Sequence, residues 1–218
     1  MNITDLENKI INADCIDILK QLPDKSVDLV LTDPPYGIGA GDIKFVNHKT
    51  KNLNKFSIYK NNDWDILPSK DVFKQIFRVS KNQIIWGGNY FVENLCNSKC
   101  WIVWDKKTGE NTYADCELAF TSFDKPVKKF TKFWLGTHAT DGDGRIHPTQ
   151  KPISLFEFCL KEFTNENDII LDCFSGSGTT AIACHRLNRR FICIEKDKDY
   201  YEASVKRLED AKKQLTLF

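Results

Sequence analysis

The 218-residue sequence lacks a long hydrophobic run, and this absence narrows the classes of protein to which it can belong. No stretch reaches the length of about 18 apolar residues that marks a membrane-spanning helix. The first ten residues, MNITDLENKI, also lack the basic, apolar and small-residue order of a secretory signal peptide. We therefore expect no membrane contact and a cytoplasmic location.

An excess of charge of one sign is missing as well. The sequence has 31 Lys and Arg against 30 Asp and Glu, whereas proteins that bind nucleic acid through phosphates usually carry a basic excess. The lysines nevertheless gather in two loop-like segments: Lys44, Lys49, Lys51, Lys55 and Lys60, and Lys125, Lys128, Lys129 and Lys132. Solvated loops and DNA contacts both account for them.

Clustered cysteines are absent although the chain has eight of them. Most stand singly in apolar stretches such as LDCFSG and RFICIE, a pattern typical of buried free thiols rather than of disulfides. Cys96 and Cys100 form a CxxxC pair without a second pair or a histidine cluster nearby. We predict no metal site.

Short apolar runs alternate along the chain with amphipathic stretches, and this order is typical of an α/β fold. Strands are predicted at 9–14, 27–33, 82–88, 100–105, 116–123, 168–174 and 190–195, and helices at 15–22, 71–79, 153–163, 179–187 and 200–215. Several strands are apolar throughout, as strands covered on both faces are. We predict one domain over residues 1–218, with a mostly parallel sheet and helices on both faces.

Two segments resist this alternation: 37–62, rich in Gly, Asn and Lys, and 134–150, rich in Gly, Asp, Thr and His. Long irregular loops in a small domain are usually functional or mobile. We assign both to the substrate side.

The segment DCFSGSGTT at 172–180 ends a predicted strand and opens a helix. Such a glycine turn brings a ligand close to backbone N–H groups at a helix N-terminus, and Glu195 ends the next strand, where a carboxylate can accept hydrogen bonds from ribose hydroxyls. The pair predicts a nucleoside-containing cofactor; a merely tight connection is the alternative. Because the Gly-Lys-Ser/Thr of a P-loop is missing, a dinucleotide and S-adenosylmethionine remain.

The tetrapeptide Asp33-Pro34-Pro35-Tyr36 directly follows the strand VDLVLT, where open α/β sheets place their active sites. Two prolines fix the backbone and remove two donors, which leaves a rigid group of acceptors. If the Asp33 carboxylate and the Pro34 carbonyl each accept one hydrogen of an aromatic amine such as adenine N6, the nitrogen lone pair is freed to attack a sulfonium methyl group. Tyr36 can stack on a base flipped out of the duplex. A turn without catalytic function is the alternative.

With these motifs in place, the sequence resembles the DNA amino-methyltransferases, specific for adenine N6 or cytosine N4, of the permuted (beta) class in which the catalytic motif precedes the cofactor motif. DPPY at 33–36, HPTQKP at 147–152 and DCFSGSGTT at 172–180 carry the resemblance in this order. WGGNYF at 86–91 and CELAFTSF at 116–123 resemble members from phage and mobile elements. The resemblance covers nearly the whole chain and implies a Rossmann-like methyltransferase fold.

The resemblance also implies that S-adenosylmethionine is the cofactor. It places Asp14 near the adenine of the cofactor, Glu195 at the ribose, and Lys151 with the loop 174–179 at the methionine end. The predicted cofactor-binding residues are Asp14, Asp33, Lys151, Asp172, Phe174, Ser175, Gly176, Ser177, Gly178, Thr179 and Glu195. Cys173 departs from the family pattern, in which proline is frequent, but a small residue there is compatible with binding.

The motif DPPY, rather than SPPY, favours adenine over cytosine as the methylated base. Cytosine N4 remains the alternative within the same mechanism. Methylation of cytosine C5 needs a cysteine nucleophile, usually after proline, and the sequence has no Pro-Cys dipeptide.

Given this resemblance, the lysine-rich segments become predicted DNA contacts. Segment 37–62 is expected to be a mobile loop that closes over the flipped base, and 106–146 a small target-recognition region, which implies a short target site. The predicted DNA-binding residues are Lys44, Lys49, Lys51, Lys55, Lys128, Lys129 and Arg145. A homodimer is expected from the family.

The sequence ends in QLTLF, which resembles the pentapeptide by which bacterial proteins dock on the replication sliding clamp. The predicted clamp-binding residues are Gln214, Leu215, Leu217 and Phe218, with the Leu-Phe pair as a hydrophobic anchor. The alternative is a helix end packed on the protein's own core.

Three competing functions remain. The first is an RNA or protein methyltransferase, because related tetrapeptides with Asn in place of Asp33 occur in such enzymes, although HPTQKP favours DNA. A DNA-binding subunit that has lost catalysis would not need an intact Asp33 and Glu195. A nicotinamide-dependent oxidoreductase would leave the DPPY motif unexplained.

Overall fold

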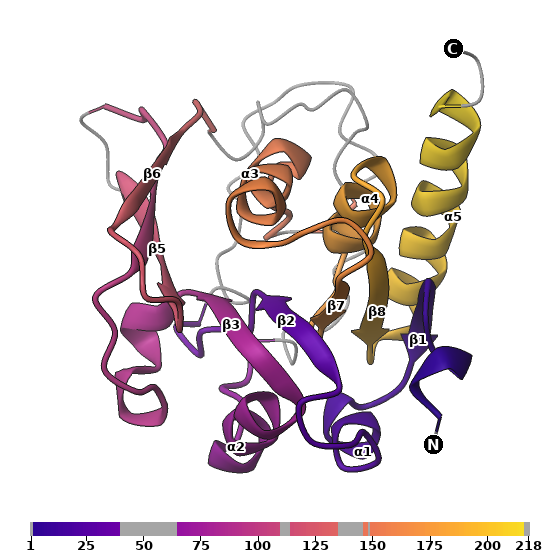
Figure 1. The fold of residues 1–218 in the computed structure, drawn as a ribbon. Helices are drawn as coiled ribbons and strands as arrows, with labels where there is room; N and C mark the ends of the chain where they lie inside the picture. Colours follow the sequence, from indigo (N-terminus) through magenta and orange to yellow (C-terminus); the bar gives the residue numbers. More distant parts are fainter. Residues whose placement is uncertain (1, 40–64, 110–113, 135–145, 148, 216–218) are drawn as a thin grey trace.

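The structure is a computed structural model that describes residues 2–39, 65–109, 114–134, 146–147 and 149–215. Its centre is one sheet with eight strands (Figure 1). In spatial order the strands are β1 (Lys9–Asn12), β8 (Arg190–Glu195), β7 (Ile169–Asp172), β2 (Val27–Thr32), β3 (Ser80–Trp86), β5 (Cys116–Thr121), β4 (Trp101–Asp105) and β6 (Lys128–Thr131).

Most neighbouring strands of the sheet are parallel. The five strands from β1 to β3 in spatial order all run in one direction. Of the remaining three strands only β5 runs the opposite way, because β5 is antiparallel to β3, β4 is antiparallel to β5, and β6 is parallel to β4. The predicted mostly parallel sheet is thus confirmed.

Helices cover both faces of the sheet, as predicted. Helices α1 (Cys15–Leu19) and α2 (Lys70–Val79) lie on one face, and α3 (Ile153–Phe163), α4 (Thr179–Arg186) and α5 (Lys198–Leu215) on the other (Figure 1). Each face has its own core because strand side chains alternate. Leu29 and Leu31 of β2 face the α3 side, whereas Val30 faces α1 and α2.

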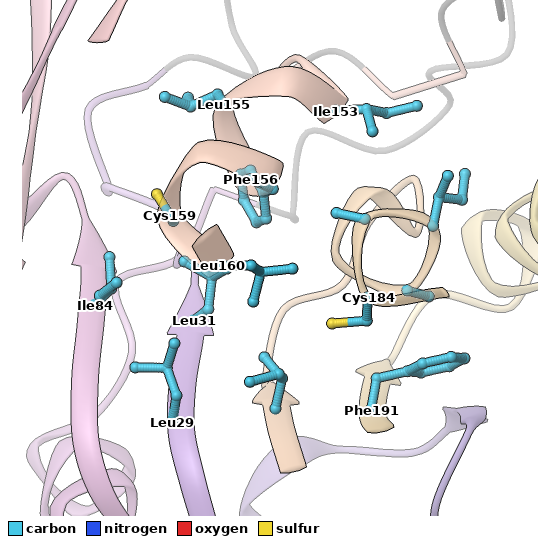
Figure 2. Packing of buried hydrophobic residues seen from close by; sticks show 14 of the residues in the cluster. Leu29, Leu31, Ile84, Ile153, Leu155, Phe156, Cys159, Leu160, Cys184 and Phe191 are labelled. Atoms are coloured by element: carbon cyan, nitrogen blue, oxygen red, sulfur yellow. The ribbon is translucent and has the colours of Figure 1, made fainter. Parts of the chain in front are cut away.

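In the core on the α3 side, helices α3 and α4 from the carboxyl half of the sequence pack against β2 and β3 from its amino half. Leu31 and Ile84 gather with Phe156 and Leu160 of α3, and Phe191 of β8 lies below Cys184 of α4 (Figure 2). Burying a large apolar side chain stabilises the fold by roughly 1.5–3 kcal/mol. This packing holds fixed the strand ends on which the candidate site is built.

Each predicted strand and helix is present, with bounds that differ by a few residues. The expectation that Lys128 and Lys129 lie in a loop is wrong, because both belong to β6 at the edge of the sheet. The sequence KKFT has one apolar residue, Phe130, whose ring packs 5.3 Å from that of Phe158 in α3. Lysines are a common feature of edge strands, where they discourage further pairing.

The eight cysteines are free thiols, as predicted, and six of them are buried while Cys96 and Cys116 are exposed. Within the described residues, no group of three or more His, Cys, Asp or Glu side chains is arranged to hold a metal ion. No helix in this part of the chain is both long and apolar enough to cross a membrane.

The two segments predicted to face the substrate, 37–62 and 134–150, are only partly described, since 40–64, 135–145 and 148 lie outside the described residues. Of 37–62, only residues 37–39 belong to the described part of the chain. Segment 106–146 contributes β5 and β6 to the main sheet, so the predicted recognition region is continuous with it.

Candidate active site

The candidate site lies where the direction of strand connection reverses. β2 leads through α2 to β3 on one side, and its neighbour β7 leads through α4 to β8 on the other. Open α/β sheets bind ligands at such a switch point, outside the carboxyl ends of the strands. The segments that follow β2 and β7, which begin with Asp33 and Cys173, therefore lie side by side although about 140 residues separate Thr32 from Asp172.

A cavity of about 870 Å³ opens at this edge of the sheet. That volume is within the range of small-molecule sites, roughly 300–1,000 Å³. The four residues of the DPPY motif line it, as do all predicted cofactor residues except Gly178. The structure thus brings together residues that the sequence places from position 14 to position 195.

Gly178 has a conformational role instead. It precedes α4 with a φ of +75°, and a Cβ at this position would lie 3.1 Å from the Cβ of Ser204 in α5. Both the left-handed backbone and the close helix packing favour glycine here. Gly178 therefore shapes the loop from behind the cavity.

The loop 173–178 is held mainly by backbone groups. The Ser175 N–H donates to the Ile194 carbonyl at 2.9 Å, and the Gly176 N–H donates to Glu195 Oε2 at 2.7 Å. Glu195 Oε1 accepts from the Asp197 N–H at 2.8 Å. Burial raises the pKa of Glu195 above its usual range, although these two N–H donors oppose the shift. A carboxylate held in this way keeps free lone pairs toward the cavity.

Asp14 is at the amino end of α1, where its Oδ1 accepts from the Ile16 N–H at 3.2 Å. Its Oδ2 pairs with Lys196 Nζ at 2.9 Å. The hydrogen bond from Lys196 holds the pKa of Asp14 below its usual range. Asp14 is therefore an ionised acceptor at the rim of the cavity.

Asp172 is buried and serves mainly to tie three elements together. Its Oδ1 accepts from Thr32 Oγ1 at 2.7 Å and from the Phe174 N–H at 3.1 Å, and its Oδ2 accepts from Thr180 Oγ1. Burial raises the pKa of Asp172 to about 6 despite these donors. It joins β2, β7 and α4 at the point where the cavity begins.

Asp33 has both carboxylate oxygens engaged. Oδ1 accepts from the Tyr36 hydroxyl at 2.7 Å, and Oδ2 accepts from Lys151 Nζ. Lys151 also donates to the Tyr36 hydroxyl at 3.1 Å. Burial raises the pKa of Asp33, while the neighbouring Lys151 ammonium opposes that rise. The carboxylate orientation is fixed by two donors that come from within the site.

Lys151 is deeply buried, with 6% of its side chain exposed, and contacts a second carboxylate. Its Nζ lies 3.1 Å from Glu117 Oε2, and Glu117 in turn pairs with Lys106. Burial alone would lower the pKa of Lys151, but the charges of Asp33 and Glu117 outweigh burial and raise it. Lys151 is thus an ammonium in direct contact with Asp33.

The Tyr36 ring belongs to a small aromatic cluster. It stacks on Tyr90 with ring centroids 4.8 Å apart and an interplanar angle of 18°, and Phe91 meets its edge at 6.0 Å. Gly87 lies so close that a Cβ there would come within 2.2 Å of Tyr36 Cε1. The segment WGGNYF at 86–91 therefore packs against the tyrosine of the DPPY motif and fixes its position.

Four side chains at or behind this site were not predicted from the sequence: Tyr90, Lys106, Glu117 and Arg207. Arg207 is buried in α5 and donates to the Ser177 carbonyl at 3.0 Å and to Thr179 Oγ1 at 3.2 Å. An arginine on the apolar face of a helix signals a polar partner, and this signal was available in the sequence. No comparable signal marks Glu117 within its strand.

The predicted DNA-binding residues fall into two groups. Lys128 pairs with Glu162 at 2.8 Å and Lys129 with Asp105 at 2.9 Å, so carboxylates on the protein balance both charges. The others lie outside the described residues: Lys44, Lys49, Lys51, Lys55 and Arg145. The same holds for Leu217 and Phe218, whereas Gln214 is exposed and Leu215 ends α5.

Comparison with known proteins relates the chain to enzymes that act on DNA. A family model described as DNA methylase matches residues 41–206. The type II methyltransferase M.HinfI of Haemophilus influenzae is 28% identical over 97% of this chain and 71% of its own length. M2.MboI of Moraxella bovis is 29% identical over 92% of this chain and 87% of its own length.

Solved structures share the fold. The M1.HpyAVI-SAM complex has a TM-score of 0.60 and 23% identity, covering 91% of this chain and 98% of that chain. The cytosine-N4-specific PvuII DNA methyltransferase has a TM-score of 0.61 and 14% identity, covering 94% of this chain and 90% of that chain. These likenesses confirm the predicted methyltransferase fold. Since the family model spans most of the sequence, the chain belongs to the DNA methylase family.

Proposed function

We propose that this chain transfers a methyl group from S-adenosylmethionine to N6 of an adenine in DNA. The observation that carries the proposal is the meeting of the DPPY motif after β2 with the loop 173–178 and Glu195 around one cavity. Membership of the DNA methylase family supports DNA as the substrate. The related M1.HpyAVI was solved with S-adenosylmethionine, which supports that cofactor.

The residues of the cavity fit this cofactor. Glu195, held by two backbone donors, would accept from ribose hydroxyls, and the ionised Asp14 would accept from the adenine amino group. The loop 173–178 would hold the methionine end, and Lys151 lines the cavity beside it. When bound, the cofactor supplies a sulfonium methyl group as the electrophile. Asp172 supports the cavity from below, because it is only 3% exposed and already accepts three protein donors.

The DPPY motif would orient the amino group that is methylated. Asp33 keeps a second lone pair on each oxygen beyond those used by Tyr36 and Lys151. The Pro34 carbonyl is a further acceptor on a backbone that prolines make rigid. With one amino hydrogen accepted by each group, the nitrogen lone pair is directed toward the methyl donor. The Lys151 ammonium opposes the rise in the Asp33 pKa that burial causes, and so favours the carboxylate form in this step.

The test is to incubate the purified protein with unmethylated genomic DNA and methyl-labelled S-adenosylmethionine, and then to digest the DNA to nucleosides. Label in N6-methyldeoxyadenosine supports the proposal. Label in N4-methyldeoxycytidine would keep the mechanism and change the base. Absence of label in DNA, with label in RNA or protein, would overturn it. Asp33→Ala should abolish labelling, which excludes a subunit that binds DNA without catalysis.

DNA contacts are proposed from the sequence for segments 37–62 and 106–146. Lys128 and Lys129 could serve only by exchanging their carboxylate partners for phosphates, so Lys129→Ala should weaken DNA binding more at low salt than at high salt. DNA affinity measured at two salt concentrations tests this. An unchanged affinity at low salt would remove Lys129 from the interface.

We also propose from the sequence that QLTLF at 214–218 docks on the replication sliding clamp. Gln214 is exposed at the end of α5, which is compatible with an accessible tail. Clamp binding of the full chain and of a version lacking 214–218 should differ, and equal or absent binding rejects the proposal. A homodimer and a cytoplasmic location are proposed from the family resemblance and the composition. Sedimentation that gives only monomer would reject the dimer.

A further inference from the structure

Four charged side chains of alternating sign form a row that begins at the DPPY motif. Their order is Asp33, Lys151, Glu117 and Lys106, and each contacts the next. Asp33 lies in the turn after β2, and Lys151 lies in the segment before α3. Glu117 belongs to β5, and Lys106 directly follows the neighbouring strand β4. None is more than about a fifth exposed, with values of 17%, 6%, 21% and 17% in that order.

Charges buried to this degree are costly unless they are paired and hydrogen-bonded. Two carboxylates and two ammonium groups balance within the row. Without Glu117, Lys151 would have Asp33 as its single carboxylate partner among the described residues. Asp33 must also bind the amino group of the substrate base. Glu117 supplies a second carboxylate on the far side of Lys151, where no substrate amino group is needed. This arrangement keeps the ammonium compensated when Asp33 binds the base.

Aromatic rings restrict Lys151 to this position. Its Nζ lies 5.5 Å from the centre of the Tyr36 ring and 5.8 Å from that of Trp86, within the distance of cation–π contact. Lys106 is placed in the same way, 5.2 Å from the centre of Trp104. In the strand register Trp104 lies opposite Glu117. Strand register therefore places Glu117 beside Trp104 and close to Lys106, which follows β4.

We propose that Glu117 is a positioning residue for methyl transfer, which holds the Lys151 ammonium against Asp33 while the base amino group binds. The inference rests on the proposed function and extends it to a residue outside the DPPY, HPTQKP and glycine-loop motifs. Glu117 acts through Lys151 and does not itself touch the base.

The consequence is a defined pH dependence. The charged or titratable groups around the row are Tyr36, Tyr90 and Asp172, in addition to its four members. The Glu117 charge raises the pKa of Lys151 and also that of Asp33. Removing it should therefore let Lys151 lose its proton at a lower pH and let Asp33 stay ionised to a lower pH. Both limbs of the pH profile should move toward lower pH.

The experiment measures single-turnover methylation of DNA against pH for the wild type and for Glu117→Gln. The expected result is a shift of both limbs to lower pH, with the maximal rate reduced about ten- to hundredfold, since displacement of a catalytic group by about 1 Å costs of that order. Binding of S-adenosylmethionine, measured by equilibrium dialysis, should be unchanged. Glu117→Asp keeps the charge and should return the limbs to their wild-type positions.

Two further variants distinguish positioning from folding damage. Lys106→Gln leaves the Glu117 charge less compensated and should move both limbs toward higher pH, the opposite direction. Glu157→Gln is a matched control because Glu157 is also 21% exposed and pairs with Arg186 at 3.4 Å, away from the site. Its pH profile should match the wild type.

The proposal is overturned if Glu117→Gln lowers the rate equally at every pH, or if Glu117→Gln and Lys106→Gln shift the limbs in the same direction. Should Glu117→Gln fail to fold, the opposite shift expected for Lys106→Gln still decides the question. If the wild type labels no DNA, the proposed function has failed and this role fails with it. If the wild type is active and the variants do not move the limbs, only the role of Glu117 is rejected.

Discussion

Replacing Gly87 by alanine tests whether the position of the Tyr36 ring matters for catalysis. Gly87 has a φ of +69°, and a Cβ there would lie 2.2 Å from Tyr36 Cε1, within the Tyr36 ring's own space. Ordinary contact begins near 3.4 Å, so the ring must move by more than 1 Å. Because Tyr36 donates to Asp33 at 2.7 Å, that movement breaks or lengthens the hydrogen bond.

Gly87→Ala should change two separate quantities, the free energy of unfolding and the methylation rate. A left-handed backbone costs a non-glycine residue roughly 1–2 kcal/mol, which should appear in the free energy of unfolding. Misplacement of a catalytic group by about 1 Å can lower the rate about a hundredfold. We therefore expect Gly87→Ala to lose both stability and methylation rate.

Gly109→Ala is the matched control for this prediction. Gly109 has the same φ of +69°, and a Cβ there would meet no atom of the described residues within 4 Å. It should show the backbone cost in chemical denaturation and keep the wild-type methylation rate per folded molecule at saturating DNA, where a change in DNA affinity at the proposed recognition region has no effect. The reasoning is refuted if Gly87→Ala methylates DNA as fast as Gly109→Ala under conditions where both are folded.

Three further changes have defined outcomes. Arg207→Met removes donors to Ser177 and Thr179, so S-adenosylmethionine should bind about tenfold more weakly in equilibrium dialysis, whereas Arg186→Met should not alter it. Since burial raises the pKa of Asp172 to about 6, its contribution to stability is complete below pH 3.8 and is lost as pH rises through 6. Unfolding free energies of the wild type and Asp172→Asn should therefore diverge over that interval, and parallel curves would contradict this. Leu160→Ala should lower the free energy of unfolding in urea by roughly 2–5 kcal/mol, because Leu160 lies fully buried on the inner face of α3.

The sequence was most informative where one physical property dominates. The strands β2, β7 and β8 are continuous apolar runs because helices cover both of their faces, and that pattern is legible without a structure. The strand β6 was missed because its position at the sheet edge leaves it with two lysines and a single apolar residue, Phe130. Edge strands need fewer apolar side chains, so their sequences resemble loops.

The candidate site was predictable only as far as its motifs extend. The DPPY motif and the glycine turn each depend on local backbone geometry, which a short sequence can specify. The contact between Lys151 and Glu117 joins positions 34 residues apart, one in the segment before α3 and one in β5, and no local pattern encodes it. Tyr90 was read as part of a resembling segment, but its stacking on Tyr36 depends on how β3 ends beside β2.

The strand order has a consequence for how the protein is made. β1 and β2 are synthesised first, yet β8 and β7 lie between them in the sheet and are synthesised last. During translation the early strands therefore expose unpaired edges until residue 195 has left the ribosome. Pairing between such distant segments is slow, because a long loop must close before any contact forms. A chain cut short before β8 would lack the partner strand of β1 and the Glu195 wall of the cavity, so the cavity would be incomplete.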